Sequence, residues 1–279
     1  MLKQMRFGRS KEIYGVVFQP EKADPNVLIV SFPGLGQAMS EKNYLFSYLR
    51  KQLSARDYRF IQFDSRGCGD SAGDLGSADL TSMTEDAMEV LKHAAESKLP
   101  RKVIMIGHGL GSVVALKTIE CWRALSNVPC IPVLISPILN PLPSVRSLIG
   151  EETLDLLKRS KYLDSKILFP GDDYYGYSDF RHEHLEFVSR LGAHMLYLHG
   201  QCLSYRLLTQ LEELEPKALL DIAGSSGHLV MNRNEPKQLL EAMQYPCKLH
   251  ALPELPYYRH PGTMDRLLRL LEQIVFDES

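Results

Sequence analysis

The sequence predicts a doubly wound α/β sheet, and two observations lead to this fold class. Apolar runs with the length of strands alternate with segments of helical periodicity, and short glycine-rich turns join them. The apolar runs are continuous rather than alternating, which is typical of parallel strands that are covered on both faces. A chain of 279 residues is also long enough to bury a substantial core.

The predicted elements follow in order along the chain. Two short alternating runs, Met1–Phe7 and Tyr14–Gln19, favour a hairpin because only a polar segment separates them. After it we expect buried strands at Asn26–Phe32, Tyr58–Asp64, Lys102–Gly107 and Ile131–Ser136. Between and after these strands the apolar spacing predicts helices at Lys42–Arg56, Asp79–Ala95 and Leu110–Leu125.

The alternation stops between Pro141 and Glu215, where the sequence holds helical material and no buried-strand run. We expect this segment to be a helical cap, so that residues 1–140 and 216–279 form the core and 141–215 the cap. The alternation resumes with "KALLDIAG" (Lys217–Gly224) as the seventh strand and "CKLHAL" (Cys247–Leu252) as the eighth. Helices are expected at Glu235–Met243 and Met264–Phe276.

Composition narrows the class of protein. Hydrophobic residues make up 44% of the chain and charged residues 24%, with a formal charge of −2 and a mean hydropathy of −0.16. These values are typical of a soluble globular protein, and they give no indication of a nucleic acid or membrane partner. Five scattered cysteines and an N-terminus without an apolar segment favour a cytoplasmic protein with reduced thiols. No motif indicates a metal or a cofactor, and the oligomeric state is not predicted.

Three glycine-rich motifs lie where predicted strands end. "SFPGLGQ" (Ser31–Gln37), "DSRGCGDSAG" (Asp64–Gly73) and "GHGLGS" (Gly107–Ser112) follow three of those strands in order. Together they resemble the α/β-hydrolase superfamily, and specifically its esterase, lipase and serine-aminopeptidase-like branch with a helical cap. In that family the first motif forms the oxyanion loop, and the third contains the nucleophile on a sharp strand-to-helix turn.

The resemblance places a glycine where the nucleophilic serine would stand. Gly109 occupies the central position of G-x-S-x-G and has no side chain that can attack a substrate. The resemblance also implies that the backbone N–H groups of Leu110 and Leu35 form the oxyanion hole, with Gly34 beside them. The sequence therefore predicts an elbow without its nucleophile.

The two other positions of the catalytic triad are also altered under this alignment. The acid position falls on Gly227, and the segment after the sixth strand, "SPILN", has no carboxylate. The histidine position falls on Tyr257. His260, three residues later, and His228, next to the acid position, remain as candidate bases. Loss at several positions favours natural degeneration of the triad.

Other side chains are candidates for lining the former active-site pocket. His108 adjoins the elbow, where we expect it to pack behind the turn. Tyr174 and Tyr175 belong to the cap segment "GDDYYGYSDF" and either wall the pocket or fasten the cap to the core. Cys68, in the second motif, is expected to be a small buried side chain rather than a displaced nucleophile.

Three hypotheses of function follow. The first is a non-hydrolytic accessory protein, for example in a biosynthetic system, that binds a small-molecule or peptidic ligand in the former active-site pocket. The second is an enzyme that reuses the pocket for isomerase-, epimerase- or lyase-type proton abstraction. The third is a weak esterase with a displaced nucleophile.

Overall fold

The fold was analysed in a computed structural model. It describes residues 1–20, 26–34, 37–41, 44–54, 58–73, 77–139, 151–152, 155, 195–198, 201–252 and 261–277. Eight strands form one sheet in the order β1-β2-β4-β3-β5-β6-β9-β10. The first two pairings, β1 with β2 and β2 with β4, are antiparallel, and all others are parallel. The predicted mostly parallel α/β sheet is confirmed.

The strands of this sheet lie close to their predicted positions. They are β1 (Leu2–Phe7), β2 (Ile13–Phe18), β3 (Val27–Phe32), β4 (Arg59–Phe63), β5 (Lys102–His108), β6 (Cys130–Ile135), β9 (His228–Asn232) and β10 (Lys248–Leu252). The four strands β3, β4, β5 and β6 are buried along their whole length. This burial explains why their sequences are continuously apolar.

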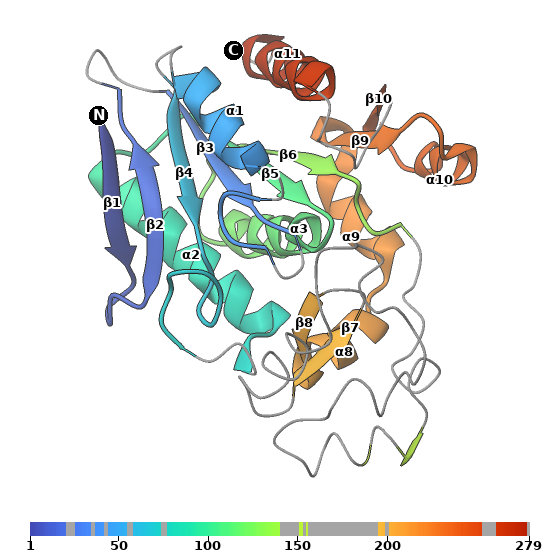
Figure 1. Cartoon of the computed structure of the whole chain (residues 1–279). Helices are drawn as coiled ribbons and strands as arrows, with labels where there is room; N and C mark the ends of the chain where they lie inside the picture. The colour runs from blue at the N-terminus through green and yellow to red at the C-terminus, as the bar shows by residue number, and fades with distance from the viewer. Residues whose placement is uncertain are drawn as a thin grey trace.

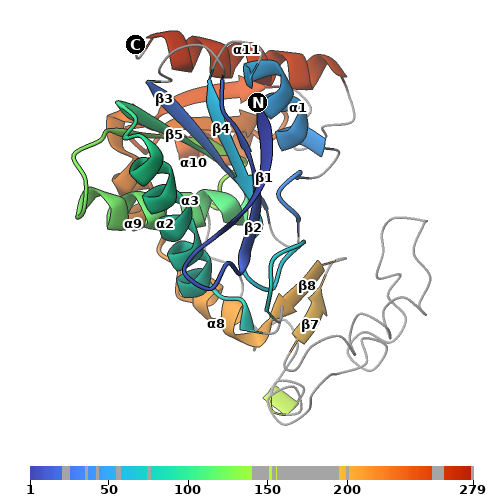
Figure 2. The same ribbon diagram turned by 90° about the vertical axis from the view of Figure 1, so that its left-hand side faces the viewer.

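Helices cover both faces of the sheet (Figures 1 and 2). One face packs on α2 (Leu80–Ser97), α3 (Leu110–Arg123) and α9 (Pro216–Ala223), and the other on α1 (Leu45–Ser54) and α11 (Pro261–Asp277). Helix α10 (Pro236–Ala242) connects β9 to β10. The two hydrophobic clusters are therefore separated by the sheet, as expected for a doubly wound fold.

The segment Lys217–Gly224 was predicted as a strand, and that prediction is wrong. It belongs to α9, which begins at Pro216 and buries Pro216, Leu219, Leu220 and Ala223. This spacing places the four side chains on one face of a helix, and proline is favoured in the first helical turn. A short apolar run cannot be assigned to strand or helix by hydrophobicity alone. The seventh strand of the sheet is instead β9.

The predicted cap differs from expectation in the part that the structure describes. Where we expected only helices, β7 (Met195–Leu198) and β8 (Gln201–Ser204) form an antiparallel pair. They precede α8 (Tyr205–Glu212). Helix α8 contacts the start of α2: Arg206 Nε lies 2.9 Å from Asp79 Oδ2, and Gln210 Oε1 accepts the N–H of Leu80 at 2.6 Å. Because α2 begins after the carboxyl end of β4, α8 lies at the edge of the sheet where the glycine-rich motifs end.

Candidate functional site

The elbow is formed by the junction of β5 and α3, where Gly109 lies between the two elements. Its backbone has φ 50° and ψ −114°. Residues other than glycine adopt this conformation only under strain. The Gly109 N–H donates to the carbonyl of Ile135 at 3.0 Å, which fixes the turn to β6. A Cβ atom built at Gly109 would meet no atom within 4 Å. The turn therefore has the geometry that presents a nucleophile, with open space in place of the side chain.

Two neighbouring glycines allow this turn to close. A Cβ atom at Gly111 would lie 2.0 Å from the carbonyl oxygen of Phe32, and one at Gly107 would lie 2.5 Å from the carbonyl oxygen of Gly111. Only glycine fits such contacts. They bring the first turn of α3 against the end of β3, where the segment that contains Gly34 begins. Ser112 is buried and donates to the carbonyl of Gly107 at 3.0 Å, so it is not a displaced nucleophile.

The start of α3 supplies the N–H of Leu110, one of the two donors that the resemblance implies. N–H groups in the first turn of a helix have no partner within that helix, and they favour negative charge. Gly34 follows β3 and lies against the elbow, since a Cβ atom there would be 2.9 Å from Nδ1 of His108. The structure thus brings Gly34, His108, Gly109 and Leu110 together. The other predicted donor, Leu35, lies outside the described residues.

A buried carboxylate that the sequence analysis did not single out joins the two loops. Oε2 of Glu41 accepts the N–H of Gly34 at 2.6 Å, and Oε1 lies 3.2 Å from Nδ1 of His108. The Glu41 side chain is 0% exposed and that of His108 is 16% exposed. His108 is thus packed behind the turn, as expected, and it is paired there. No sequence spacing links residue 41 to either motif, so only the fold reveals the contact.

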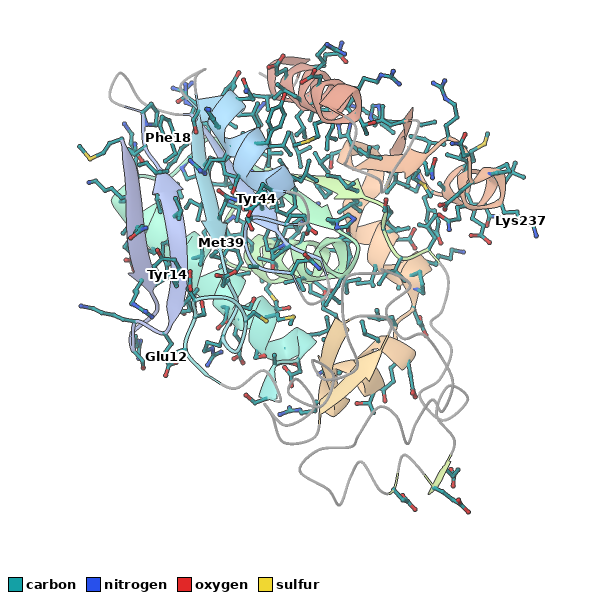
Figure 3. All side chains as sticks on the ribbon, in the orientation of Figure 1. Glu12, Tyr14, Phe18, Met39, Tyr44 and Lys237 are labelled. Atoms are coloured by element: carbon teal, nitrogen blue, oxygen red, sulfur yellow. The ribbon has the colours of Figure 1, made fainter. Side chains whose placement is uncertain are left out.

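The loop after β4 has a structural role. The buried carboxylate of Asp64 accepts the N–H groups of Met39 at 2.6 Å and Asp70 at 3.0 Å (Met39 is labelled in Figure 3). Burial raises the pKa of Asp64, while these two hydrogen bonds act in the opposite direction. Asp64 therefore fixes this loop to the segment before α1.

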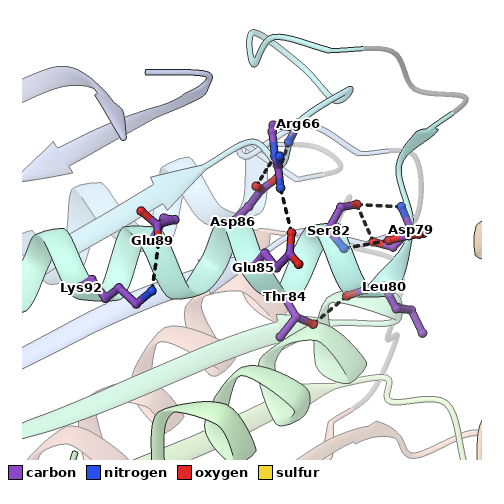
Figure 4. A network of polar contacts seen from close by, with 9 residues as sticks. All are labelled: Arg66, Asp79, Leu80, Ser82, Thr84, Glu85, Asp86, Glu89 and Lys92. Carbon is purple, nitrogen blue, oxygen red and sulfur yellow. Dashed lines mark hydrogen bonds and ion pairs between the residues drawn. The ribbon is translucent and has the colours of Figure 1, made fainter. Parts of the chain in front are cut away.

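A second buried carboxylate, that of Asp86 on α2, accepts hydrogen bonds from the same loop. Arg66 donates to it through the backbone N–H at 2.6 Å and through Nε at 2.5 Å (Figure 4). Cys68 belongs to the same loop, and burial, followed by the Asp64 and Asp86 charges, raises the pKa of its thiol to about 11. Since the thiolate is the nucleophilic form, Cys68 is a poor nucleophile.

The placement of Gly227 at the acid position of the triad is wrong, because the seventh strand is β9. Gly227 precedes that strand and lies at its amino end, whereas the elbow is at the carboxyl ends. After β9 the chain continues as Asn232-Arg233-Asn234-Glu235, so Glu235 has the G-x-x-D spacing that the family's acid shows. Its Oε1 accepts a hydrogen bond from Nδ2 of Asn232 at 3.3 Å. Under the resemblance, Glu235 therefore replaces Gly227 as the residue expected at the acid position.

The candidate base His228 does not face the elbow. It pairs with Val133 of β6. Val133 lies two residues before Ile135, which pairs with His108 next to the elbow. His228 shares the face of Val230, which packs in the α1–α11 cluster. Its Nδ1 lies 2.9 Å from Nε2 of His250, and the two rings are stacked.

The other predicted site residues fall outside the described ranges. They are Tyr174 and Tyr175 in the cap, and Tyr257 and His260 after β10. Among the residues that the structure does describe, no group of three or more His, Cys, Asp or Glu side chains is placed to hold a metal ion. No helix in those ranges has the length and apolarity needed to cross a bilayer.

Comparison with known proteins shows the family of this chain. The sequence pattern of the family described as serine aminopeptidase, S33, matches residues 23–210. None of the curated proteins matches the chain.

Many solved structures share the fold. The α/β hydrolase GrgF from Penicillium sp. sh18 is 15% identical, with 98% of each chain covered and a TM-score of 0.67. Est1E from Butyrivibrio proteoclasticus, solved with ferulic acid bound, is 14% identical; 95% of this chain and 94% of that chain are covered, with a TM-score of 0.62. A monoacylglycerol lipase from Paleococcus ferrophilus is 17% identical; 95% of this chain and 98% of that chain are covered, with a TM-score of 0.57.

Proposed function

Because the chain belongs to the serine aminopeptidase S33 family of α/β hydrolases, we propose that it has kept the family's binding geometry and lost the family's nucleophile. On this proposal it binds a small-molecule or peptidic ligand through a carbonyl or carboxylate oxygen and does not hydrolyse it at the elbow. The observation that carries the proposal is Gly109. Its backbone has the strained elbow conformation, and open space replaces the catalytic side chain.

The donors around the elbow support a ligand of this chemistry. The N–H of Leu110 begins a 14-residue helix and so favours a negatively charged oxygen. Gly111 allows the turn to pack against the end of β3, and Gly107 allows it to pack against the first turn of α3, so no larger residue fits at either position. Without a serine, an ester or amide held at this point meets no attacking group. Removal of triad members lowers turnover by roughly 10⁴- to 10⁶-fold.

Glu235 favours a second candidate function, an enzyme that abstracts a proton from its ligand. In this fold a carboxylate at the acid position orients a histidine base and stabilises the positive charge that the histidine gains when it takes a proton. On this alternative, a histidine paired with Glu235 removes a proton next to a carbonyl whose oxygen is held by the hole. Exchange of a ligand's carbon-bound hydrogen with solvent deuterium, followed by NMR over a range of pH, separates it from simple binding.

The binding proposal is tested by adding bulk at the open point. We expect Gly109→Leu to abolish binding of short acyl carboxylates and N-acyl peptides, measured by saturation-transfer NMR against a panel of such compounds. Gly109→Ala is the matched control, because it introduces the same backbone strain with little bulk. Equal binding by Gly109→Leu and the parent would place the ligand site elsewhere and refute the proposal.

A further inference from the structure

We infer that a cavity at the amino ends of the parallel strands is a second binding site, which takes a small molecule that carries a phosphate monoester group. The inference goes beyond the proposed function, because the cavity is separate from the elbow. Its wall includes Val27, Lys102 and Cys130, the first residues of β3, β5 and β6. The elbow follows the last residue of β5. The length of that strand, roughly 20 Å at about 3.3 Å per residue, therefore lies between the two sites.

Three cationic residues line this cavity. Arg101 directly precedes β5, Lys102 begins that strand, and Arg123 lies in the last turn of α3. None of the described residues that line the cavity is acidic. Like charges repel one another, and a concave wall of low dielectric concentrates their field. An anion in the cavity relieves this repulsion, so the arrangement favours an anionic ligand.

Helix ends account for part of this positive charge but not for all of it. Nη1 of Arg123 donates to the carbonyl of Ile222 in α9 at 2.8 Å. Nζ of Lys102 donates to the carbonyl of Val275 in α11 at 3.4 Å. Both carbonyls lie near the carboxyl ends of their helices, where cations are favourable. Arg101 has no such helix: its side chain is exposed, and no carboxylate of the described residues forms an ion pair with it.

The two arginines have the donors that a phosphate group requires. A guanidinium has five N–H donors, and the contact with Ile222 uses one of those of Arg123. Paired N–H groups of arginine match the spacing of phosphate oxygens, and such charge-assisted hydrogen bonds are short and strong. A phosphate monoester carries a charge of about −1.5 to −2 at pH 7. It therefore offsets the positive charge of the cavity better than a singly charged carboxylate does.

The rest of the wall fits an organic group attached to the phosphate. The cavity has a volume of about 640 Å³, within the range of roughly 300–1,000 Å³ that small-molecule sites show. Apolar residues, including Val128 and Ile131, line it together with residues that carry amide or hydroxyl groups, including Asn127 and Ser226. Apolar walls gain contacts with an organic group that inorganic phosphate cannot make. The ligand expected here is therefore a small phosphorylated organic molecule.

Titration of the full chain with phenyl phosphate, followed by amide NMR, tests the inference. We expect saturable shifts of the amide resonances of Asn127 and Val128 in the cavity wall, and weaker binding of inorganic phosphate. Arg101→Gln and Arg123→Gln should each lower the affinity for phenyl phosphate by at least about tenfold, because each removes hydrogen bonds to a charged group. Both arginines are exposed, so both variants should fold. Lys237→Gln, which removes one positive charge from the exposed surface of α10 (Figure 3), is the matched control and should leave the affinity unchanged.

The elbow also favours a negatively charged oxygen, so a further variant separates the two sites. Gly109→Leu should leave the affinity for phenyl phosphate unchanged, because Gly109 lies at the other end of β5 from the cavity. Loss of phenyl phosphate binding in Gly109→Leu would overturn the inference, and so would equal affinity in the parent and both arginine variants. Unmoved resonances of Asn127 and Val128 at millimolar phenyl phosphate would overturn it as well. Inorganic phosphate that binds as tightly as phenyl phosphate would refute the assignment of a monoester.

Discussion

Replacement of Gly109 by alanine tests the elbow conformation on which the site depends. At φ 50° and ψ −114° a side chain is strained even though nothing lies within 4 Å of the new Cβ. Such a conformation costs about 1–3 kcal/mol. We therefore expect Gly109→Ala to lower the free energy of unfolding by about 2 kcal/mol. For a domain of this size the melting temperature should fall by roughly 4–8 °C.

Urea denaturation and calorimetry measure this loss, and two other glycines provide the comparison. Gly224 has φ 58° and equally open space at the end of α9, far from the elbow. Gly224→Ala should therefore show a similar loss from strain alone. Gly111→Ala should be far worse, because its Cβ would lie 2.0 Å from the carbonyl oxygen of Phe32.

The sign of the change in the free energy of unfolding shows whether Gly109 has the elbow conformation. If Gly109 had an ordinary backbone conformation, alanine would stabilise the protein by about 0.4–1 kcal/mol through the unfolded state. A Gly109→Ala variant as stable as the parent, or more stable, would refute the elbow geometry.

Three further predictions follow from the site and its supports. Gly109→Ser alone should not hydrolyse p-nitrophenyl butyrate, because the resemblance to the family places Tyr257, and no histidine, at the position of the base that would activate the hydroxyl; turnover would show that a histidine such as His260 acts as the base. Asp64→Ala should lower the free energy of unfolding by about 1–3 kcal/mol in urea titrations, because it leaves two loop N–H groups without their acceptor. A loss indistinguishable from zero would refute that support. Burial, with the Lys248 charge, lowers the pKa of His250, so the unfolded chain binds more protons and stability should fall as pH drops below about 6.5. His250→Gln should reduce this slope in melting curves recorded between pH 7.5 and 5, and an equal slope in both proteins would contradict the assignment.

The succession of strands and helices along the parallel core could be predicted because it depends on local sequence patterns. The continuous apolar runs of β3, β5 and β6 and the glycines after them identify buried strands and tight turns without knowledge of their neighbours. Lys217–Gly224 was predicted as a strand because the same apolar residues satisfy a short strand or one face of a helix. That error displaced the predicted seventh strand, and the position expected for the acid fell on Gly227 instead of Glu235.

Glu41 could not have been found from its spacing. Its contacts with Gly34 and His108 depend on the end of β3 lying beside the end of β5, which is a consequence of sheet order and not of sequence distance. His228 shows the reverse case, since proximity in sequence to the presumed acid suggested a base that the strand register directs toward α11.

The claim that the elbow carries no nucleophile is tested most directly by a fluorophosphonate probe on the unmodified protein. Labelled peptides would be located by mass spectrometry, and p-nitrophenyl butyrate hydrolysis would be followed in parallel. We predict that no serine is labelled and that no turnover is detected. Labelling of any serine, with loss of turnover when that serine is replaced by alanine, would contradict the account.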